Sequence, residues 1–149
     1  MHTPFLHLPG ASRAITLGAT QCAFLVTGGD TDGQVGLFEL TLEPGARGAG
    51  LHIHKRLTEV FYVVEGEATL LLNDQQVVAQ AGATMFVPPN TPHGFANLSA
   101  QPVKLLFLFW PPTGREQFFE GLAAMAQQSP PPSADQALAF MAQFDQYPV

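Results

Sequence analysis

Charged residues are scarce in this chain. Only 12% of its 149 residues are charged, against roughly 25% in an average globular protein. Lys and Arg together number six, and the net charge is −6, so the basic surface that binds nucleic acid is missing. Since 46% of the residues are hydrophobic, we expect a folded protein. Residues 14–18 and 23–27 read as exposed apolar strands, and sheet edges are commonly covered by a partner, so we expect a homodimer.

Cysteine and long apolar runs are also scarce. Cys22 is the only cysteine, so no intrachain disulfide can form, and we interpret it as a small buried side chain. The longest apolar run, residues 103–110, contains Lys104 and is shorter than the roughly 18 residues that a membrane span needs. The N-terminal segment lacks the basic and apolar regions of a signal peptide. These features predict a soluble, cytoplasmic protein with no membrane partner.

Short strands dominate the first three quarters of the sequence. From about residue 13 to residue 110, segments rich in Val, Leu, Phe and Thr alternate with turns rich in Gly, Pro and Asn. Many short strands without helices between them indicate an all-β sandwich or barrel. We therefore assign residues 1–112, N-terminal strands included, to one β-barrel.

The sequence pattern changes from strand-like to helix-like after residue 112. Residues 115–128 place apolar side chains at helical spacing, and residues 134–144 do so again. Ser133 and Gln136 fit a capping box at the start of the second segment. We expect residues 113–149 to form a two-helix extension that packs on the barrel or on a partner subunit.

Residues 50–66, GLHIHKRLTEVFYVVEG, carry two histidines two positions apart. Side chains at i and i+2 of a strand point the same way, so His52 and His54 project two imidazoles to one side, where a shared metal ion explains them. Glu59 has the wrong parity for one straight strand. We therefore expect a corner at KRLT, after which Glu59 faces inward with the histidines. We also expect a hairpin around residues 65–66.

A third imidazole has to come from another segment. His93 follows a strand and a turn, GATMFVPPNTP, in which Pro88, Pro89 and Asn90 fix its position. His2 and His7 lie in a polar, proline-containing terminal segment and are not expected to be ligands. Two simpler readings remain open: the three histidines are surface or hydrogen-bonded residues, or Glu59 only orients a histidine.

The two segments together resemble the motifs of the cupin family. The first motif is Gly, five residues, His-x-His, three or four residues, Glu, six residues, Gly; it is matched at His52, His54, Glu59 and Gly66. The second is Gly, five residues, Pro-x-Gly, two residues, His, three residues, Asn; it is matched at Gly82, Pro88, His93 and Asn97. Ala46 replaces the leading glycine of the first motif. Asn90 replaces the central glycine of the second, where an asparagine tolerates left-handed backbone better than most residues.

The resemblance covers roughly residues 34–110. It implies a cupin jelly roll (a double-stranded β-helix barrel) that holds one divalent transition metal on His52, His54, Glu59 and His93. Fe, Mn, Ni, Co, Cu and Zn all tolerate this ligand set, so the metal stays undetermined. The tail PPTGREQFFEGL looks like that of small single-domain cupins similar to quercetin dioxygenases.

This likeness favours a metal-dependent dioxygenase that acts on a small aromatic or enol-type substrate with O₂, and in which Glu59 takes up the substrate proton. By alternation and apolar character, the expected cavity-lining residues are Phe61, Met85, Phe95 and Phe107. One alternative is a non-oxidative isomerase, lyase or decarboxylase, which needs a further acid–base residue such as Glu39 or Tyr147 near the metal. Another is a non-catalytic protein that binds a small molecule.

Overall fold

The computed structural model describes residues 3–149 as eleven strands and two α-helices around one core. The strands are β1 (Ala14–Leu17), β2 (Thr20–Val26), β3 (Gly36–Leu42), β4 (Ala49–Ile53), β5 (Thr58–Glu65), β6 (Glu67–Leu72), β7 (Gln75–Gln80), β8 (Thr84–Val87), β9 (His93–Ala96), β10 (Val103–Trp110) and β11 (Tyr147–Pro148). A short 3₁₀ turn, η1 (Gly28–Thr31), joins β2 to β3. The helices are α1 (Arg115–Ala126) and α2 (Ala134–Gln143).

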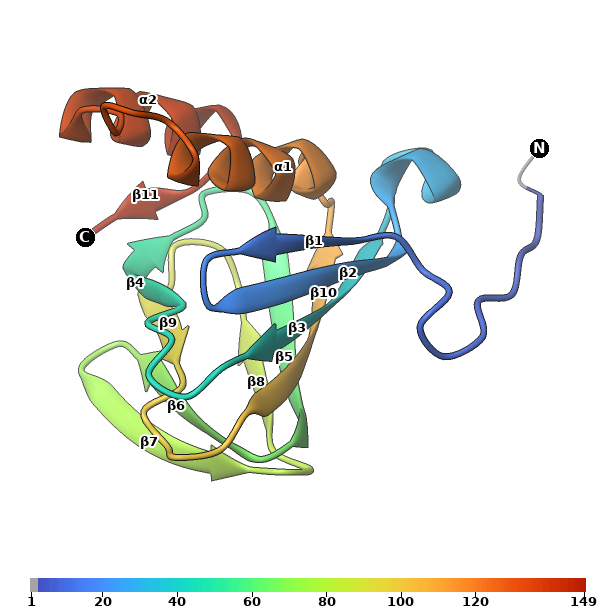
Figure 1. The fold of residues 1–149 in the computed structure, drawn as a ribbon, viewed down its shortest axis with the longest axis horizontal. Helices are drawn as coiled ribbons and strands as arrows, with labels where there is room; N and C mark the ends of the chain where they lie inside the picture. The colour runs from blue at the N-terminus through green and yellow to red at the C-terminus, as the bar shows by residue number, and fades with distance from the viewer. Residues whose placement is uncertain (1–2) are drawn as a thin grey trace.

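Two antiparallel sheets form the barrel. The first has the order β1-β2-β3-β10-β5-β8 and the second has the order β11-β4-β9-β6-β7 (Figure 1). Strands distant in sequence, such as β3 and β10, lie side by side in the first sheet. The predicted jelly roll is therefore confirmed.

Alternation along the strands builds the core. In β3 and β10 every second side chain is buried, because successive residues of a strand point to opposite faces. Phe61 and Phe107 meet inside the barrel with ring centroids 4.6 Å apart in an edge-to-face arrangement. Cys22 is fully buried in the same core, as expected.

The segment around residues 65–66 corrects one prediction. β5 pairs with β10 and β8, whereas β6 pairs with β7 and β9, so the two strands belong to different sheets and form no hairpin. Gly66 has φ +79°, and a Cβ there would lie 2.6 Å from the carbonyl oxygen of Pro102. Glycine is needed here because the chain bends sharply from one sheet to the other against a neighbouring strand.

A second correction concerns the N-terminal strands. β2 lies between β1 and β3, so most of residues 23–27 belongs to an interior strand of the sheet. β1 stands at the end of the strand order and pairs with β2. The apolar character of residues 23–27 therefore reflects packing within this chain, with Phe24 only 3% exposed.

The C-terminal extension covers one end of the barrel. Figure 1 shows α1 and α2 lying across this end, beside β1 and β11. The ring of Phe119 lies 5.1 Å from that of Phe38, and Phe118 stacks on Phe140 at 5.9 Å. Ser133 accepts a hydrogen bond from the amide of Gln136, which completes the predicted capping box of α2. Neither helix of the described chain is long and apolar enough to cross a membrane.

Candidate metal centre

Four buried side chains converge inside the barrel. The candidate ligand atoms of His52, His54, Glu59 and His93 all lie within 4.8 Å of one another, and each residue is at most 4% exposed. His52 and His93 are directly paired across β4 and β9, and His54 follows β4. Glu59 reaches the cluster from β5, in the opposite sheet.

The predicted corner explains how Glu59 joins the histidines. Between β4 and β5 the chain leaves one sheet and enters the other, and Glu59, Phe61 and Val63 are the buried residues of β5. The turn before His93 is also as expected: Asn90 has φ +63°, and its amide donates to the carbonyl oxygen of His54. The two motif segments are therefore hydrogen-bonded to each other next to the cluster.

Hydrogen bonds set the same tautomer in all three imidazoles. Each Nδ1 lies next to a backbone carbonyl oxygen: Gly50 for His52 at 2.8 Å, Asp145 for His54 at 2.6 Å, and Thr91 for His93 at 2.8 Å. A carbonyl oxygen can only accept, so each Nδ1 must carry a proton and donate it. In each neutral ring the unprotonated nitrogen is then Nε2, the atom available to a metal ion.

Glu59 points at these same Nε2 atoms. Its Oε2 lies 3.2 Å from Nε2 of His54 and 2.9 Å from Nε2 of His93. A carboxylate that only oriented an imidazole would accept from Nδ1–H, but the backbone carbonyls already occupy those positions. Lone pairs that converge on a carboxylate need protons or a cation between them, so the geometry favours Glu59 as a fourth ligand.

The pKa values of the cluster are suited to cation binding. Burial raises the pKa of Glu59, but protons shared between its carboxylate and the Nε2 atoms of His54 and His93, where a metal ion could take their place, outweigh burial and lower it to about 2. Burial, and after it the neighbouring His93, lowers the pKa of His52 to about 4. Glu59 is therefore ionised and His52 is neutral at neutral pH, which are the protonation states that metal ligands need.

The donor set fits a divalent transition metal. Three imidazole nitrogens and one carboxylate oxygen suit Fe, Mn, Ni, Co, Cu and Zn, and four protein ligands leave one position open in five-coordinate geometry and two in octahedral geometry. The cluster could thus hold the predicted metal ion, whose identity remains open.

A cavity of about 540 Å³ opens beside the cluster. His52, His54 and Glu59 form part of its wall. The rest is mainly apolar and comes from β3, β4, β9, β10, the β1–β2 turn and the C-terminal extension. This size suits a small organic ligand.

The four residues predicted to line the cavity divide into two pairs. Phe95 and Phe107 do line it. Phe61 and Met85, which are paired between β5 and β8, are not among the residues of this wall, so a role in the cavity stays a prediction for them. Phe61 is fully buried among the rings of Phe95, Phe107 and His93. Alternation gave the correct face of these strands, but it contains no information on depth within the barrel.

Two buried neighbours of the cluster were missed from the sequence. Arg115, the first residue of α1, is 1% exposed and lines the cavity with its guanidinium beside His54. Asp145, 1% exposed, accepts from the amides of Lys55, Arg56 and Leu57 in the corner before Glu59. The sequence offered one signal for Arg115: it is one of only six Lys and Arg residues, so each basic side chain is worth examining.

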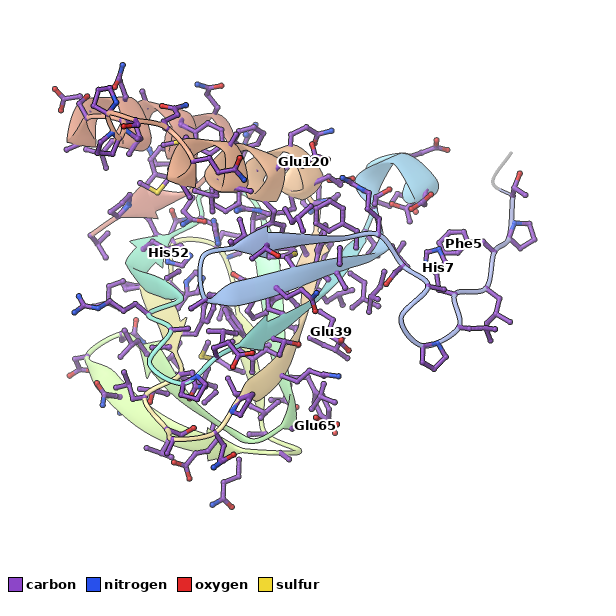
Figure 2. All side chains as sticks on the ribbon, viewed as in Figure 1. Phe5, His7, Glu39, His52, Glu65 and Glu120 are labelled. Atoms are coloured by element: carbon purple, nitrogen blue, oxygen red, sulfur yellow. The ribbon has the colours of Figure 1, made fainter. Side chains whose placement is uncertain are left out.

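The other candidate acid–base residues lie elsewhere. Figure 2 shows Glu39 on the outside of the barrel, where Oε1 lies 3.6 Å from Nζ of Lys104. The Tyr147 hydroxyl faces the carbonyl oxygen of Ala142. His7 lies on the N-terminal segment away from the barrel (Figure 2), and His2 falls outside the described residues.

Comparison with known proteins agrees with this architecture. The cupin domain family (Cupin_2) matches residues 38–109. A crystal structure of an RmlC-like cupin from Shewanella frigidimarina shares 26% sequence identity with a TM-score of 0.65, covering 78% of this chain and 96% of that chain. The structure of KdgF from a Halomonas species shares 19% identity with a TM-score of 0.67, covering 76% and 99%. The chain belongs to the cupin superfamily.

A curated relative matches at the level of sequence. The uncharacterized protein MJ1618 of Methanocaldococcus jannaschii is 33% identical over 66 residues, which are 44% of this chain and 53% of that protein. The match therefore spans about half the length of the relative. Its similarity concerns one segment and leaves the activity of this chain open.

Proposed function

We propose that this cupin is a metal-dependent dioxygenase that acts on a small aromatic or enol-type substrate. The observation that carries the proposal is the convergence of three imidazoles and the Glu59 carboxylate beside a mainly apolar cavity, whose wall includes His52, His54 and Glu59. A bound divalent metal would supply a Lewis acid and an open coordination position. Both atoms of O₂ enter the substrate in this class of reaction, so no external reductant is required.

The residues of the cavity have distinct roles in this proposal. The rings of Phe95, Phe107 and Phe109 hold a flat, apolar substrate and exclude water from the cluster. Glu59 takes the hydroxyl proton of the substrate as it binds, because its carboxylate faces the cavity and is ionised. Glu59 is thus the proposed catalytic residue as well as a ligand.

The lining disfavours non-oxidative chemistry. Among the described residues, the ionisable side chains of the wall are His52, His54, Glu59 and Arg115. An isomerase, lyase or decarboxylase needs a further proton carrier, and the positions of Glu39 and Tyr147 do not provide one. Arg115 keeps its proton at neutral pH, because burial lowers its pKa only to about 10.

Oxygen consumption tests the proposal. Protein reconstituted separately with Fe, Mn, Ni, Co and Cu is mixed with a flavonol, a β-diketone or a catechol in an oxygen electrode. We expect uptake with at least one metal and substrate class, and no uptake by His93→Ala under the same conditions. Absence of uptake in every combination would reject the dioxygenase and leave a non-oxidative or ligand-binding cupin.

We further propose that the protein works as a homodimer through the outer face of the six-stranded sheet. Tyr62 and Phe86 are 42% and 58% exposed on adjacent strands, and Phe86 lies 6.3 Å from Trp110. Exposed aromatic clusters of this kind are typical of protein interfaces. Light scattering should give a dimer for the native chain and a monomer for Phe86→Arg; a native monomer would reject this proposal. A cytoplasmic location remains a prediction.

A further inference from the structure

Arg115 is a buried cation whose hydrogen bonding is incomplete. Its Nη1 donates to Oε1 of Gln146 at 3.1 Å, and its Nη2 donates to the carbonyl oxygen of Phe144 at 2.6 Å. Its Nε is buried and has no hydrogen-bond partner among the described residues. Nη2 also lies 3.4 Å from Nδ1 of His54, but this nitrogen already donates to Asp145 and cannot accept.

The surroundings of Arg115 hold the guanidinium in place without neutralising it. Its Cζ lies 4.5 Å from the ring centroid of Phe118 and 5.2 Å from that of Phe109. The carboxylate of Asp145 is occupied by three backbone amides. A buried N–H donor without a partner costs free energy, and this cost disappears when a ligand oxygen accepts from it.

The charge of the cavity also favours a ligand with a negatively charged oxygen. With a divalent ion on the cluster, the ion and Arg115 together carry three positive charges, which the carboxylates of Glu59 and Asp145 offset only in part, and Asp145 also lies 3.9 Å from Nε of the exposed Arg56. The other lining residues from α1 and β10 are apolar, including Phe107, Phe109 and Phe118. A substrate with one anionic group and an apolar body would complement both parts of the cavity.

We propose that Arg115 is the substrate-recognition residue of this cavity and that it selects an apolar substrate carrying an ionised oxygen group, a carboxylate or a phenolate. The proposal rests on the cavity being the substrate site of the proposed function. Nε–H of Arg115 and the free N–H bonds of its Nη atoms are the donors to this group, and Phe95, Phe107 and Phe109 contact the apolar body.

Paired ligands that differ only in charge test this proposal. The probes are 2-naphthoate and 2-naphthamide, together with 4-phenylbutyrate and 4-phenylbutyramide, and binding to zinc-loaded protein is measured by calorimetry. We expect the native chain to prefer each carboxylate over its amide by about tenfold or more, as one charge-assisted hydrogen bond provides. Arg115→Gln should lose this preference at unchanged zinc content, and Arg115→Lys should recover part of it.

Arg13 provides the matched control. It is also an arginine that contacts the helical extension, through Glu120 of α1, but it is exposed and lies outside the cavity wall. Arg13→Gln should keep the full carboxylate preference. If Arg115 only anchors the C-terminal segment, Arg115→Gln lowers thermal stability but leaves the carboxylate-to-amide ratio unchanged, and this result would overturn the proposal.

Two further outcomes would also overturn it. One is equal or undetectable binding of acid and amide by the native chain. The other is a preference that survives in Arg115→Gln but disappears in metal-depleted His93→Ala, because the metal would then bind the anion. None of these results depends on O₂ uptake, so a failure of the dioxygenase proposal and a failure of this one can be told apart.

Discussion

Replacing Asp145 by asparagine should destabilise the corner that joins the two halves of the metal centre. Oδ1 of Asp145 accepts from the amide of Lys55 at 3.1 Å, and Oδ2 accepts from Arg56 at 2.8 Å and Leu57 at 3.0 Å. An asparagine can keep its oxygen on the last two amides, but its NH₂ group then faces the N–H of Lys55. Since Asp145 has φ +62°, which asparagine tolerates well, the substitution adds no backbone strain.

The expected loss of unfolding free energy follows from these contacts. One hydrogen bond to a charged, buried acceptor is lost and two others become neutral, which together cost about 3 kcal/mol of unfolding free energy. For a chain of this length, that corresponds to a fall in Tm of about 6–12 °C. The exposed Asp74 in the β6–β7 turn provides a control, and Asp74→Asn should change the unfolding free energy by less than about 0.5 kcal/mol.

The pH dependence separates the charge of Asp145 from its shape. Burial raises the pKa of Asp145, but the amides of Leu57, Arg56 and Lys55 outweigh burial and hold it below its ordinary value. The stabilisation is therefore complete above the unfolded-state pKa of about 3.9 and is lost as the pH falls through the lower folded-state value. Urea unfolding of metal-free protein at several pH values should show the deficit of Asp145→Asn above about pH 5 and a smaller one below pH 4. A deficit under 1 kcal/mol, or one independent of pH, would refute the reasoning.

Three further predictions concern the cluster and the barrel. Glu59→Gln should weaken zinc binding about 10- to 100-fold in a competition assay with a chelator. Glu39→Gln, outside the barrel, should not change the zinc affinity. Equal affinities of the two variants would mean that Glu59 is no ligand. Because burial lowers the pKa of His52 to about 4, its ring resonances in the metal-free protein should stay those of a neutral imidazole from pH 8 to pH 5, and a midpoint near 6.5 would contradict this. Gly66→Ala should lower the unfolding free energy by about 2 kcal/mol or more, because its φ is +79° and a Cβ would meet a carbonyl oxygen, while Gly29→Ala should have little effect.

The histidine–glutamate cluster was predictable because each of its two segments has a spacing that can be read locally. His52 and His54 point to the same side of the chain. The parity of Glu59 already required a corner between His54 and Glu59. Asn90 was expected to adopt left-handed backbone before His93, and it does so at φ +63°.

The other features of the site and the fold depend on tertiary contacts, which leave no local pattern in the sequence. Arg115 and Asp145 reach the centre because the helical extension folds back over the barrel end, 61 residues from His54 in the case of Arg115. The hairpin expected at Gly66 was wrong because a corner between sheets needs the same positive φ as a hairpin turn. Alternation predicted that Phe61 faces inward, and it is fully buried, but alternation could not say whether it reaches the cavity.

Metal content tests the central claim most directly. Native protein, His93→Ala and His7→Ala are purified in parallel, incubated with equal zinc, desalted and measured by elemental analysis. His7 is exposed on the N-terminal segment, so its substitution controls for the loss of a histidine as such. We predict about one metal ion per chain for native protein and His7→Ala, and less than about a tenth of that for His93→Ala. Equal metal content in all three proteins would contradict the assignment of the centre.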